Sequence, residues 1–307
     1  IAHVTADAGI KVVVTNDIVE EHTDYVELLN KAGVQRVPSM QHRIFLGAGH
    51  REGFMDRDTF CGLAETIDPG DVEKRHAGTT INDTALMFYT SGTTSMPKGC
   101  PLNHIVLQHA GVVGGTDRLQ LMEGDVVWNP LPMFHSAFTQ PLTGTLHVGG
   151  TLVSTAHFEP HQALDLITRE RVTVAFPAFP TITVQILHHP RYTPETLSGV
   201  RVMLNVGSPE ELIAMQALMP HTIQITCFGM SECGGSVAMC DPDDPLPLRS
   251  ECSGRALPGI DIEVRDPETG ETLAHGERGE IVARGRGVFS GYYNDPNKTE
   301  AAFWEGG

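Results

Sequence analysis

A loop dense in hydroxyl side chains follows an apolar, strand-like run at residues 86–89. The loop and its tip hold Thr90, Ser91, Gly92, Thr93, Thr94 and Ser95, and Lys98 follows after Met96 and Pro97. Glycine permits close backbone approach, N–H and hydroxyl groups donate hydrogen bonds to an anion, and a lysine adds positive charge. These residue types at this spacing therefore predict a phosphate-binding loop.

The loop is not a Walker A motif, because that motif ends in Gly-Lys-Ser/Thr. Here Pro97 precedes Lys98 and Gly99 follows it. A solvated turn is the alternative interpretation, since clusters of serine and threonine are usually loops. The loop taken alone leaves both interpretations open.

A second candidate segment, residues 227–232, follows a predicted strand at 223–227. The carboxyl end of a strand is where α/β proteins bind ligands. The Phe228 ring suits stacking on a base, the Ser231 hydroxyl suits a phosphate oxygen, and Glu232 is a hard oxygen ligand suited to Mg²⁺. An ordinary exit from a strand into a loop is the alternative.

A third segment, Gly207-Ser208-Pro209, lies between a predicted strand at 200–206 and a predicted helix at 210–219. Ser208 is a favourable helix cap, and Pro209 suits the first helical position. A helix start of this kind also suits a nucleotide edge or a carboxylate. The structural and the binding interpretation are compatible with each other.

Taken in order, these segments resemble the adenylate-forming (AMP-binding) superfamily of acyl-CoA ligases, luciferases and peptide-synthetase adenylation domains. The family's phosphate loop is Tyr-Thr-Ser-Gly-Thr-Thr-Gly-x-Pro-Lys-Gly, and this chain departs from it at Ser95. Phe228 stands for the family's adenine-stacking tyrosine, and Ser231 for the threonine that contacts the α-phosphate. Residues 131–135, Leu-Pro-Met-Phe-His, are similar to the family's segment at the acyl pocket.

The resemblance implies a role for each matching residue. The residues implied to hold the β- and γ-phosphates of ATP are Thr90, Ser91, Gly92, Thr93, Thr94 and Lys98. Those implied to border the rest of the nucleotide are Gly207, Ser208, Pro209, Phe228, Gly229 and Met230. In the implied catalytic set, Ser231 holds the α-phosphate, Glu232 holds Mg²⁺, and His135 positions or gates the acyl group.

Three later segments, at 254–259, 279–285 and 291–294, are turns and short strands punctuated by glycine. They resemble landmarks of the family's β-rich subdomain, where their role is mainly structural.

The 307 residues are 40% hydrophobic and 19% charged, as in an ordinary soluble globular protein. A formal net charge of −17 argues against nucleic acid and against an anionic membrane surface as partners. None of the six cysteines forms a C-x-x-C pair, which disfavours zinc and redox motifs and favours a reducing cytoplasm. No apolar run reaches transmembrane length. A start at Ile1 and the ending Trp304-Glu305-Gly306-Gly307 predict a piece of a longer protein.

Strands and helices alternate up to residue 227, which predicts an α/β fold of mostly parallel sheets flanked by helices. The predicted division is an N-terminal portion at 1–80, a nucleotide- and acyl-binding subdomain at 81–235 and a small β-rich subdomain at 236–307. The N-terminal portion should contain a strand at 10–15, a helix at 24–32 and a strand-like piece at 34–37. An irregular stretch at 47–82, with a turn at Asp68-Pro69-Gly70, should follow.

These patterns and the resemblance predict an AMP-forming acyl-CoA ligase that uses ATP, Mg²⁺ and CoA. Apolar residues within 133–187 favour a hydrophobic, fatty acid as the substrate. The alternatives are an adenylation domain or aryl-acid ligase that passes the acyl group to a carrier thiol, and a non-catalytic nucleotide-binding relative. The family's ribose-binding aspartate and closing lobe would lie beyond Trp304, so the chain alone should bind ATP weakly and turn over poorly. Its oligomeric state stays open, with a homodimer among the options.

Overall fold

In the computed structural model, residues 1–90 and 96–304 are described, and the chain falls into two compact units. Unit 1 is assembled from Ile1–Asp83, Tyr89–Gly99 and Tyr292–Pro296, and unit 2 from Thr84–Phe88, Cys100–Gly291 and Asn297–Gly307. Neither unit is therefore one continuous stretch of sequence. The division into three subdomains stays a prediction.

Unit 1 contains a parallel three-stranded sheet in the order β1-β2-β3. Its strands are β1 (Val12–Thr15), β2 (His42–Phe45) and β3 (Met55–Asp56), and its first helices are α1 (Ala2–Asp7) and α2 (Tyr25–Lys31). Asp24 caps α2 by accepting a hydrogen bond from the Glu27 N–H at 2.9 Å. The strand expected at 10–15 and the helix expected at 24–32 are confirmed.

Two expectations for unit 1 are wrong. Residues 34–37 are not a strand, because Gly33 turns the chain at φ +71° into a 3-10 helix, η1 (Val34–Arg36). The stretch at 47–82 is not irregular, since it contains α3 (Arg57–Gly62), the 3-10 helix η2 (Leu63–Thr66) and α4 (Pro69–Gly78). Asp68 accepts a hydrogen bond from the Gly70 N–H at 2.8 Å, so Asp68-Pro69 begins a helix where we expected a turn.

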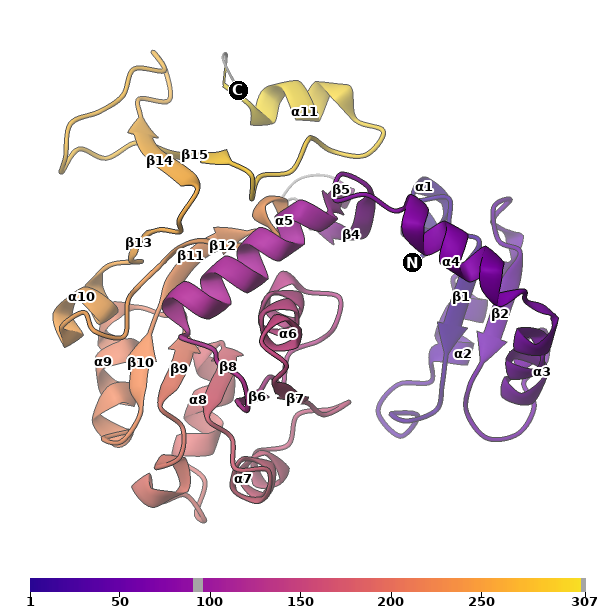
Figure 1. Cartoon of the computed structure of the whole chain (residues 1–307), viewed down its shortest axis with the longest axis horizontal. Helices are drawn as coiled ribbons and strands as arrows, with labels where there is room; N and C mark the ends of the chain where they lie inside the picture. Colours follow the sequence, from indigo (N-terminus) through magenta and orange to yellow (C-terminus); the bar gives the residue numbers. More distant parts are fainter. Residues whose placement is uncertain (91–95, 305–307) are drawn as a thin grey trace. The chain divides into compact units, whose positions relative to one another are not determined.

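Unit 2 is built on a five-stranded sheet in the order β10-β9-β8-β6-β7, and every pair in it is parallel (Figure 1). The strands are β6 (Val126–Trp128), β7 (Thr151–Val153), β8 (Val174–Ala178), β9 (Val202–Asn205) and β10 (Ile223–Ile225). The helices around it are α5 (His104–Gln108), α6 (Ser136–His147), α7 (Pro160–Arg169), α8 (Pro180–Leu187) and α9 (Pro209–Leu218). The predicted parallel sheet with flanking helices is confirmed.

Side chains alternate across this sheet into two hydrophobic cores. Val127 and Leu204 belong to the core that includes Phe138 of α6, whereas Trp128 and Met203 belong to the core formed with α7, α8 and α9. Both faces of the sheet are thus buried, as expected for parallel strands. The carboxyl ends of the strands remain available for a site.

Asn103 caps helix α5 by accepting a hydrogen bond from the Val106 N–H at 3.4 Å. The helix continues as a π-helix, η3 (His109–Arg118), which packs against α6. A Cβ atom on Gly144 of α6 would lie 2.5 Å from the Gly111 carbonyl oxygen, so glycine permits this close approach.

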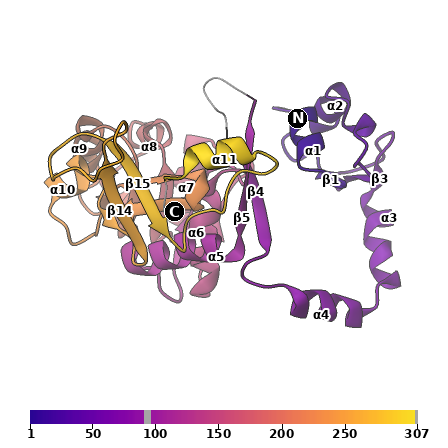
Figure 2. The same cartoon turned by 90° about the horizontal axis from the view of Figure 1, so that it is seen from above.

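Seven further strands and four further helices complete the elements of the described residues. The strands are β4 (Thr84–Thr90), β5 (Lys98–Asn103), β11 (Cys227–Met230), β12 (Gly235–Met239), β13 (Arg255–Ala256), β14 (Ile260–Arg265) and β15 (Glu280–Gly285). β11, β12 and β13 form one antiparallel sheet, β14 pairs with β15 (Figure 2), and β4 and β5 form a two-stranded sheet. The remaining helices are η4 (Pro194–Leu197), η5 (Ser231–Cys233), α10 (Leu246–Glu251) and α11 (Pro296–Ala302).

Among the described residues, no helix is both long enough and apolar enough to cross a membrane.

Candidate functional site

The predicted phosphate loop joins the end of β4 to the start of β5. Ser91, Gly92, Thr93 and Thr94 lie outside the described residues, whereas Thr90 and Lys98 lie within them. Thr90 Oγ1 is buried and has no hydrogen-bond partner in the described part of the chain. A buried, unpaired hydroxyl costs free energy. A phosphate oxygen at this place would satisfy it, so Thr90 fits the predicted ligand.

Helix α1 contacts both flanks of the loop. The Tyr89 hydroxyl donates a hydrogen bond to Asp7 Oδ2 at 2.6 Å, and His3 Nε2 donates to the Pro97 carbonyl oxygen at 3.3 Å. Burial, followed by the hydrogen bond to Asp7, raises the pKa of Tyr89 above its ordinary value, so the phenol stays protonated. The chain on either side of the loop is thus tied to one helix.

Lys98 lies against an aromatic ring from the far end of the chain. Its Nζ atom is 4.2 Å from the centre of the Tyr292 ring, within the range of a cation–π interaction. The Tyr293 N–H donates to the Gly99 carbonyl oxygen at 2.8 Å, which holds this segment beside the start of β5. The family resemblance implies a mainly structural role for residues 291–294.

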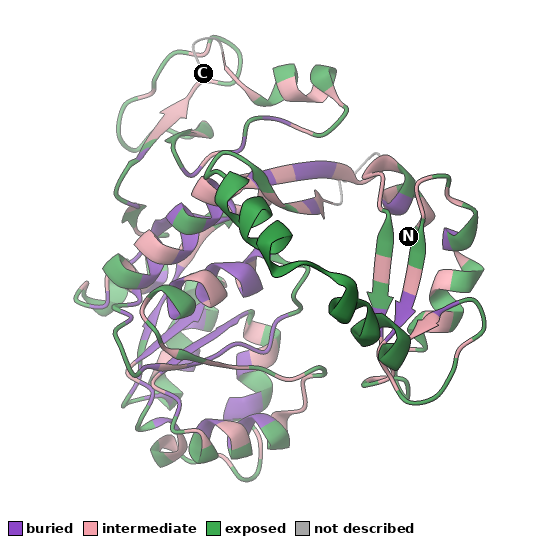
Figure 3. Cartoon of the chain, turned by 45° about the vertical axis from the view of Figure 1, so that its right-hand side comes forward, coloured by how far each residue is buried: buried purple, intermediate pink, exposed green. Residues whose placement is uncertain are grey.

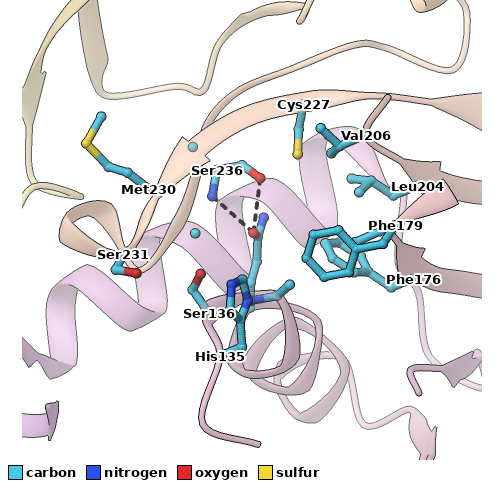
Figure 4. A pocket seen from close by; sticks show the side chains of 15 residues that line it. His135, Ser136, Phe176, Phe179, Leu204, Val206, Cys227, Met230, Ser231 and Ser236 are labelled. Carbon is cyan, nitrogen blue, oxygen red and sulfur yellow. Dashed lines mark hydrogen bonds between the residues drawn. The ribbon is translucent and has the colours of Figure 1, made fainter. Parts of the chain in front are cut away.

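Unit 2 contains a cavity of about 250 Å³ (Figure 4). It is lined by His135, Ser136, Ala137, Gln140, Phe176, Ala178, Phe179, Leu204, Val206, Cys227, Gly229, Met230, Ser231, Gly235 and Ser236. Four of the predicted site residues, His135, Gly229, Met230 and Ser231, therefore share one pocket. Thr90 and Lys98 belong to unit 1.

The pocket has a polar and an apolar part. The hydroxyls of Ser136 and Ser231 and the ring of His135 lie on one side, and Phe176, Leu204 and Val206 lie on the other (Figure 4). The first turn of α6 supplies His135 and Ser136, so the positive end of that helix dipole is at the polar part. This arrangement suits a molecule with an anionic head and an apolar body.

His135 is the cap of α6. Its Nδ1 atom accepts a hydrogen bond from the Ala137 N–H at 3.0 Å, so the neutral ring carries its proton on Nε2. The ring contacts Phe179 edge-on, with 5.9 Å between the ring centres. Partial removal from water lowers the pKa of His135 below its ordinary value of 6.5. At neutral pH the ring is therefore an uncharged donor.

The turn from β11 into η5 shapes the pocket beside Ser231. A Cβ atom on Gly229 would lie 2.1 Å from the Gly235 carbonyl oxygen, so glycine is required where β11 meets β12. Phe228 does not line the pocket and is partly buried against the core of unit 2. Its predicted stacking on adenine stays a prediction.

Glu232 lies in η5 beside the pocket. Burial, followed by the Glu232 carboxylate, raises the pKa of the Cys233 thiol to about 12. No three His, Cys, Asp or Glu side chains of the described residues form a metal-binding cluster. Mg²⁺ commonly takes one or two carboxylates and obtains its other oxygens from substrate phosphates and water. A single Glu232 fits an ion that arrives with a nucleotide.

The segment at 207–209 forms the predicted helix cap. Ser208 Oγ accepts a hydrogen bond from the Glu211 N–H at 3.3 Å, and Glu211 Oε2 accepts one from the Ser208 N–H at 2.8 Å. This reciprocal pair is a capping box that begins α9 at Pro209. The three residues do not line the cavity. Their predicted contact with a nucleotide stays a prediction.

Three polar residues of the pocket, Ser136, Gln140 and Ser236, are not among those that the sequence predicts. Ser136 is 7% exposed and lines the pocket. Gln140 is 3% exposed, and its Oε1 accepts hydrogen bonds from the backbone N–H and the hydroxyl of Ser236, both at 3.0 Å (Figure 4). The one signal in the sequence was the position of Gln140, which lies among apolar and small residues of α6.

Cys227 also lines the pocket, and it is a protonated thiol. Burial raises its pKa to about 11. Because the thiolate is the nucleophilic form, this cysteine is not an activated nucleophile at neutral pH. Covalent catalysis by Cys227 is therefore disfavoured.

Several known proteins are similar to this chain. The family model described as AMP-binding enzyme matches residues 1–293. The chain is 32% identical over 259 residues to 4-coumarate–CoA ligase 3 of Oryza sativa subsp. japonica, covering 81% of this chain and 47% of the relative. It is 34% identical over 235 residues to the 4-coumarate–CoA ligase of Pinus taeda, covering 74% and 44%. The chain thus spans about half the length of these curated relatives.

Solved structures show the same fold. A Rhodopseudomonas palustris protein, provisionally named a long-chain-fatty-acid CoA ligase, aligns with a TM-score of 0.82 at 28% identity, covering 99% of this chain and 71% of that one. ATP-bound MatB from the same organism aligns with a TM-score of 0.77 at 26% identity, covering 100% and 56%. With the family model covering nearly the whole sequence, the chain belongs to the AMP-binding enzyme family.

Proposed function

We propose that the protein activates a hydrophobic carboxylic acid with ATP and transfers the acyl group to CoA. The observation that carries this proposal is the divided pocket of unit 2, with Ser136, His135 and Ser231 on one side and apolar walls on the other. A carboxylate suits the polar side, because a helix start and hydroxyl donors stabilise an anion. The acid's apolar body suits the walls.

In the first step, a carboxylate oxygen attacks the α-phosphorus of ATP. A new O–P bond forms as the bond to the β-phosphate breaks, and pyrophosphate leaves with the electron pair. In the second step, the CoA thiolate attacks the acyl carbon, and AMP leaves as the C–O bond breaks. Such chemistry depends chiefly on positioning and charge neutralisation.

We assign positioning and charge neutralisation to named residues of the described chain. Within this proposal, Lys98 and Thr90 bind the outer phosphates, and Ser231 donates a hydrogen bond to the α-phosphate. His135 presents its Nε2–H as a donor toward the acid, because its Nδ1 is occupied by the Ala137 N–H. The neutral ring therefore positions the acid and does not act as a base through either nitrogen. Glu232 would hold Mg²⁺, which supplies positive charge to the phosphates.

Two substrate classes compete within this proposal. The cavity of about 250 Å³ with its aliphatic and aromatic walls supports a fatty acid. The Phe176 and Phe179 rings, and the likeness to 4-coumarate–CoA ligases, support an aryl acid. We retain the fatty acid as the first candidate and the cytoplasm as the place of reaction.

The test is an assay of pyrophosphate release by the longest form of the protein that its gene encodes. Mg·ATP is supplied with dodecanoate or with 4-coumarate, each with and without CoA, and the thioester is identified by mass. Dodecanoyl-CoA supports the proposal as stated, and 4-coumaroyl-CoA supports it with an aryl acid. Pyrophosphate without a thioester would move the acceptor to a carrier-protein thiol. No pyrophosphate with any acid of a broad panel would overturn the proposal in favour of a non-catalytic nucleotide-binding protein.

A further inference from the structure

We infer that Tyr292 is a positioning residue for the phosphate-binding lysine. Its ring holds the Lys98 ammonium group in place before the nucleotide arrives. The inference rests on the proposed function in one respect, namely that Lys98 binds the phosphates of ATP.

The contact is specific in its geometry. Lys98 Nζ is 4.2 Å from the centre of the Tyr292 ring, and both side chains are half-buried. The backbone of the same segment is fixed independently, because the Tyr293 N–H donates to the Gly99 carbonyl oxygen at 2.8 Å. This bond sets Tyr292 beside the first residue of β5.

Glycine is needed to deliver the ring to this place. Gly291 has φ +136°, a conformation that residues with a side chain rarely adopt. A Cβ atom there would also lie 2.5 Å from Thr299 Cγ2. The order glycine, tyrosine, tyrosine thus has a physical reason at each position: a turn, a ring and a backbone donor.

A held lysine binds phosphate better than a mobile one. A free lysine side chain has many rotamers, and binding an anion would restrict them. The ring restricts them beforehand, so less entropy is lost when the phosphate binds. An ammonium group has three N–H donors. One of them can face the ring while the other two donate hydrogen bonds to phosphate oxygens.

The experiment measures Mg·ATP binding by calorimetry with the longest encoded form of the protein. Tyr292→Leu should weaken binding by about threefold to tenfold, since a cation–π contact at a partly exposed site has that worth. Tyr292→Phe retains the ring and should bind as the wild type does. Tyr293→Leu is the matched control, because the adjacent residue contributes its backbone N–H to β5.

A double-mutant cycle separates positioning from a general structural effect. In a Lys98→Met background, Tyr292→Leu should have no further effect on ATP affinity. In the otherwise wild-type protein, Tyr292→Leu should raise the KM for ATP. It should leave kcat at saturating ATP and the KM for the acid unchanged.

The outcomes distinguish the two proposals. If Lys98→Met leaves ATP affinity unchanged, the phosphate role of Lys98 in the proposed function fails. If Lys98→Met weakens binding but Tyr292→Leu does not, or acts equally in both backgrounds, the positioning role is overturned and the proposed function stands. Tighter binding by Tyr292→Leu would also overturn it, because the ring would then compete with phosphate for the lysine.

Discussion

His135 joins the structure of α6 to the chemistry of the pocket. Its Nδ1 atom caps the helix, so Nε2–H is the part of the ring left for a ligand. Protonation would place a second donor at Nδ1, opposite the Ala137 N–H, and the cap would be lost. The lowered pKa of His135 is consistent with a site that keeps the ring neutral.

We expect His135 to make stability depend on pH. Its pKa is lower in the folded than in the unfolded chain, so the unfolded state binds more protons between the two values. Stability should therefore fall as the pH drops below about 6.5, the unperturbed value. His135→Asn should keep the cap and remove this loss. His135→Ala should cost about 0.5–2 kcal/mol at pH 8 and less at pH 5.5, where the wild type begins to lose the cap by protonation. Urea unfolding at pH 8 and pH 5.5 measures both effects. An identical pH dependence in wild type and His135→Asn would refute the assignment.

Sequence patterns located some site residues and not others, for a physical reason. His135 and Ser231 were found because each lies in a short motif next to a strand or helix start. Ser136 and Gln140 were missed because a polar residue in an amphipathic helix is usually on the solvent face. Only the packing of α6 against β12 shows that Gln140 points inward to Ser236.

At the scale of elements, one ion pair between a buried carboxylate and a partly buried arginine joins the starts of three strands. Arg201, just before β9, donates to both carboxylate oxygens of Asp125, just before β6, at 2.6 and 2.7 Å. Thr173, just before β8, donates to the same carboxylate at 2.7 Å. Burial tends to raise the pKa of Asp125, but these hydrogen bonds outweigh it and the pKa is lowered. The group thus fixes the relative register of neighbouring parallel strands.

Removing this carboxylate should destabilise unit 2 far more than removing an exposed one. Asp125→Ala leaves Arg201 partly buried without its partner, and we expect a loss of about 2–4 kcal/mol. Asp165→Ala is the control, because Asp165 also pairs with an arginine, Arg191, but at the surface; it should change stability little. Denaturant unfolding at pH 7 compares the two.

The pH dependence follows from the lowered pKa of Asp125. The unfolded carboxyl group binds a proton first as the pH falls, so the pair's contribution is present at neutral pH and lost as the pH falls through the folded pKa. Asp125→Ala should therefore lose more unfolding free energy than Asp165→Ala at pH 7, and this difference should shrink in strong acid. Equal losses in the Asp125 and Asp165 variants at pH 7 would contradict this account.

Elements were predicted well where local signals agreed. The strands of unit 2 are short apolar runs between helices, and their parallel order follows from that alternation. The missed α4 shows the reverse case, because its composition is polar and only the Asp-Pro start indicated a helix. The contact of Tyr292 with Lys98 depends on tertiary folding, which no local pattern contains.

At the scale of the molecule, one long stretch is entirely solvent-exposed. Every residue from 57 to 84 is exposed, including both α3 and α4, although Phe60, Ile67 and Val72 are large and apolar (Figure 3). Short helices without a buried face are marginally stable. This stretch should therefore open more readily than the rest of the described chain.

Limited trypsin digestion should cut this stretch first. Arg57, Lys74 and Arg75 lie in it and are exposed, whereas the pocket and sheet of unit 2 are packed. We expect early fragments that end at these residues, identified by mass, with or without Mg·ATP. First cuts elsewhere, with 57–84 intact, would show that another surface covers the two helices.

The segments of the two units alternate along the sequence, which has a consequence for how the gene can recombine. Three contacts hold the surroundings of the loop: the hydrogen bonds Tyr89–Asp7 and Pro97–His3 and the cation–π contact Lys98–Tyr292. The partner residues lie far apart in the sequence. No single crossover between two related genes could exchange all of unit 1. A recombinant that takes only residues 1–83 from another parent would pair them with residues 89–99 and 292–296 of a different lineage. The contacts between these segments would then join residues that had mutated independently. The surroundings of the loop should therefore have changed mainly by substitution, one compatible residue at a time.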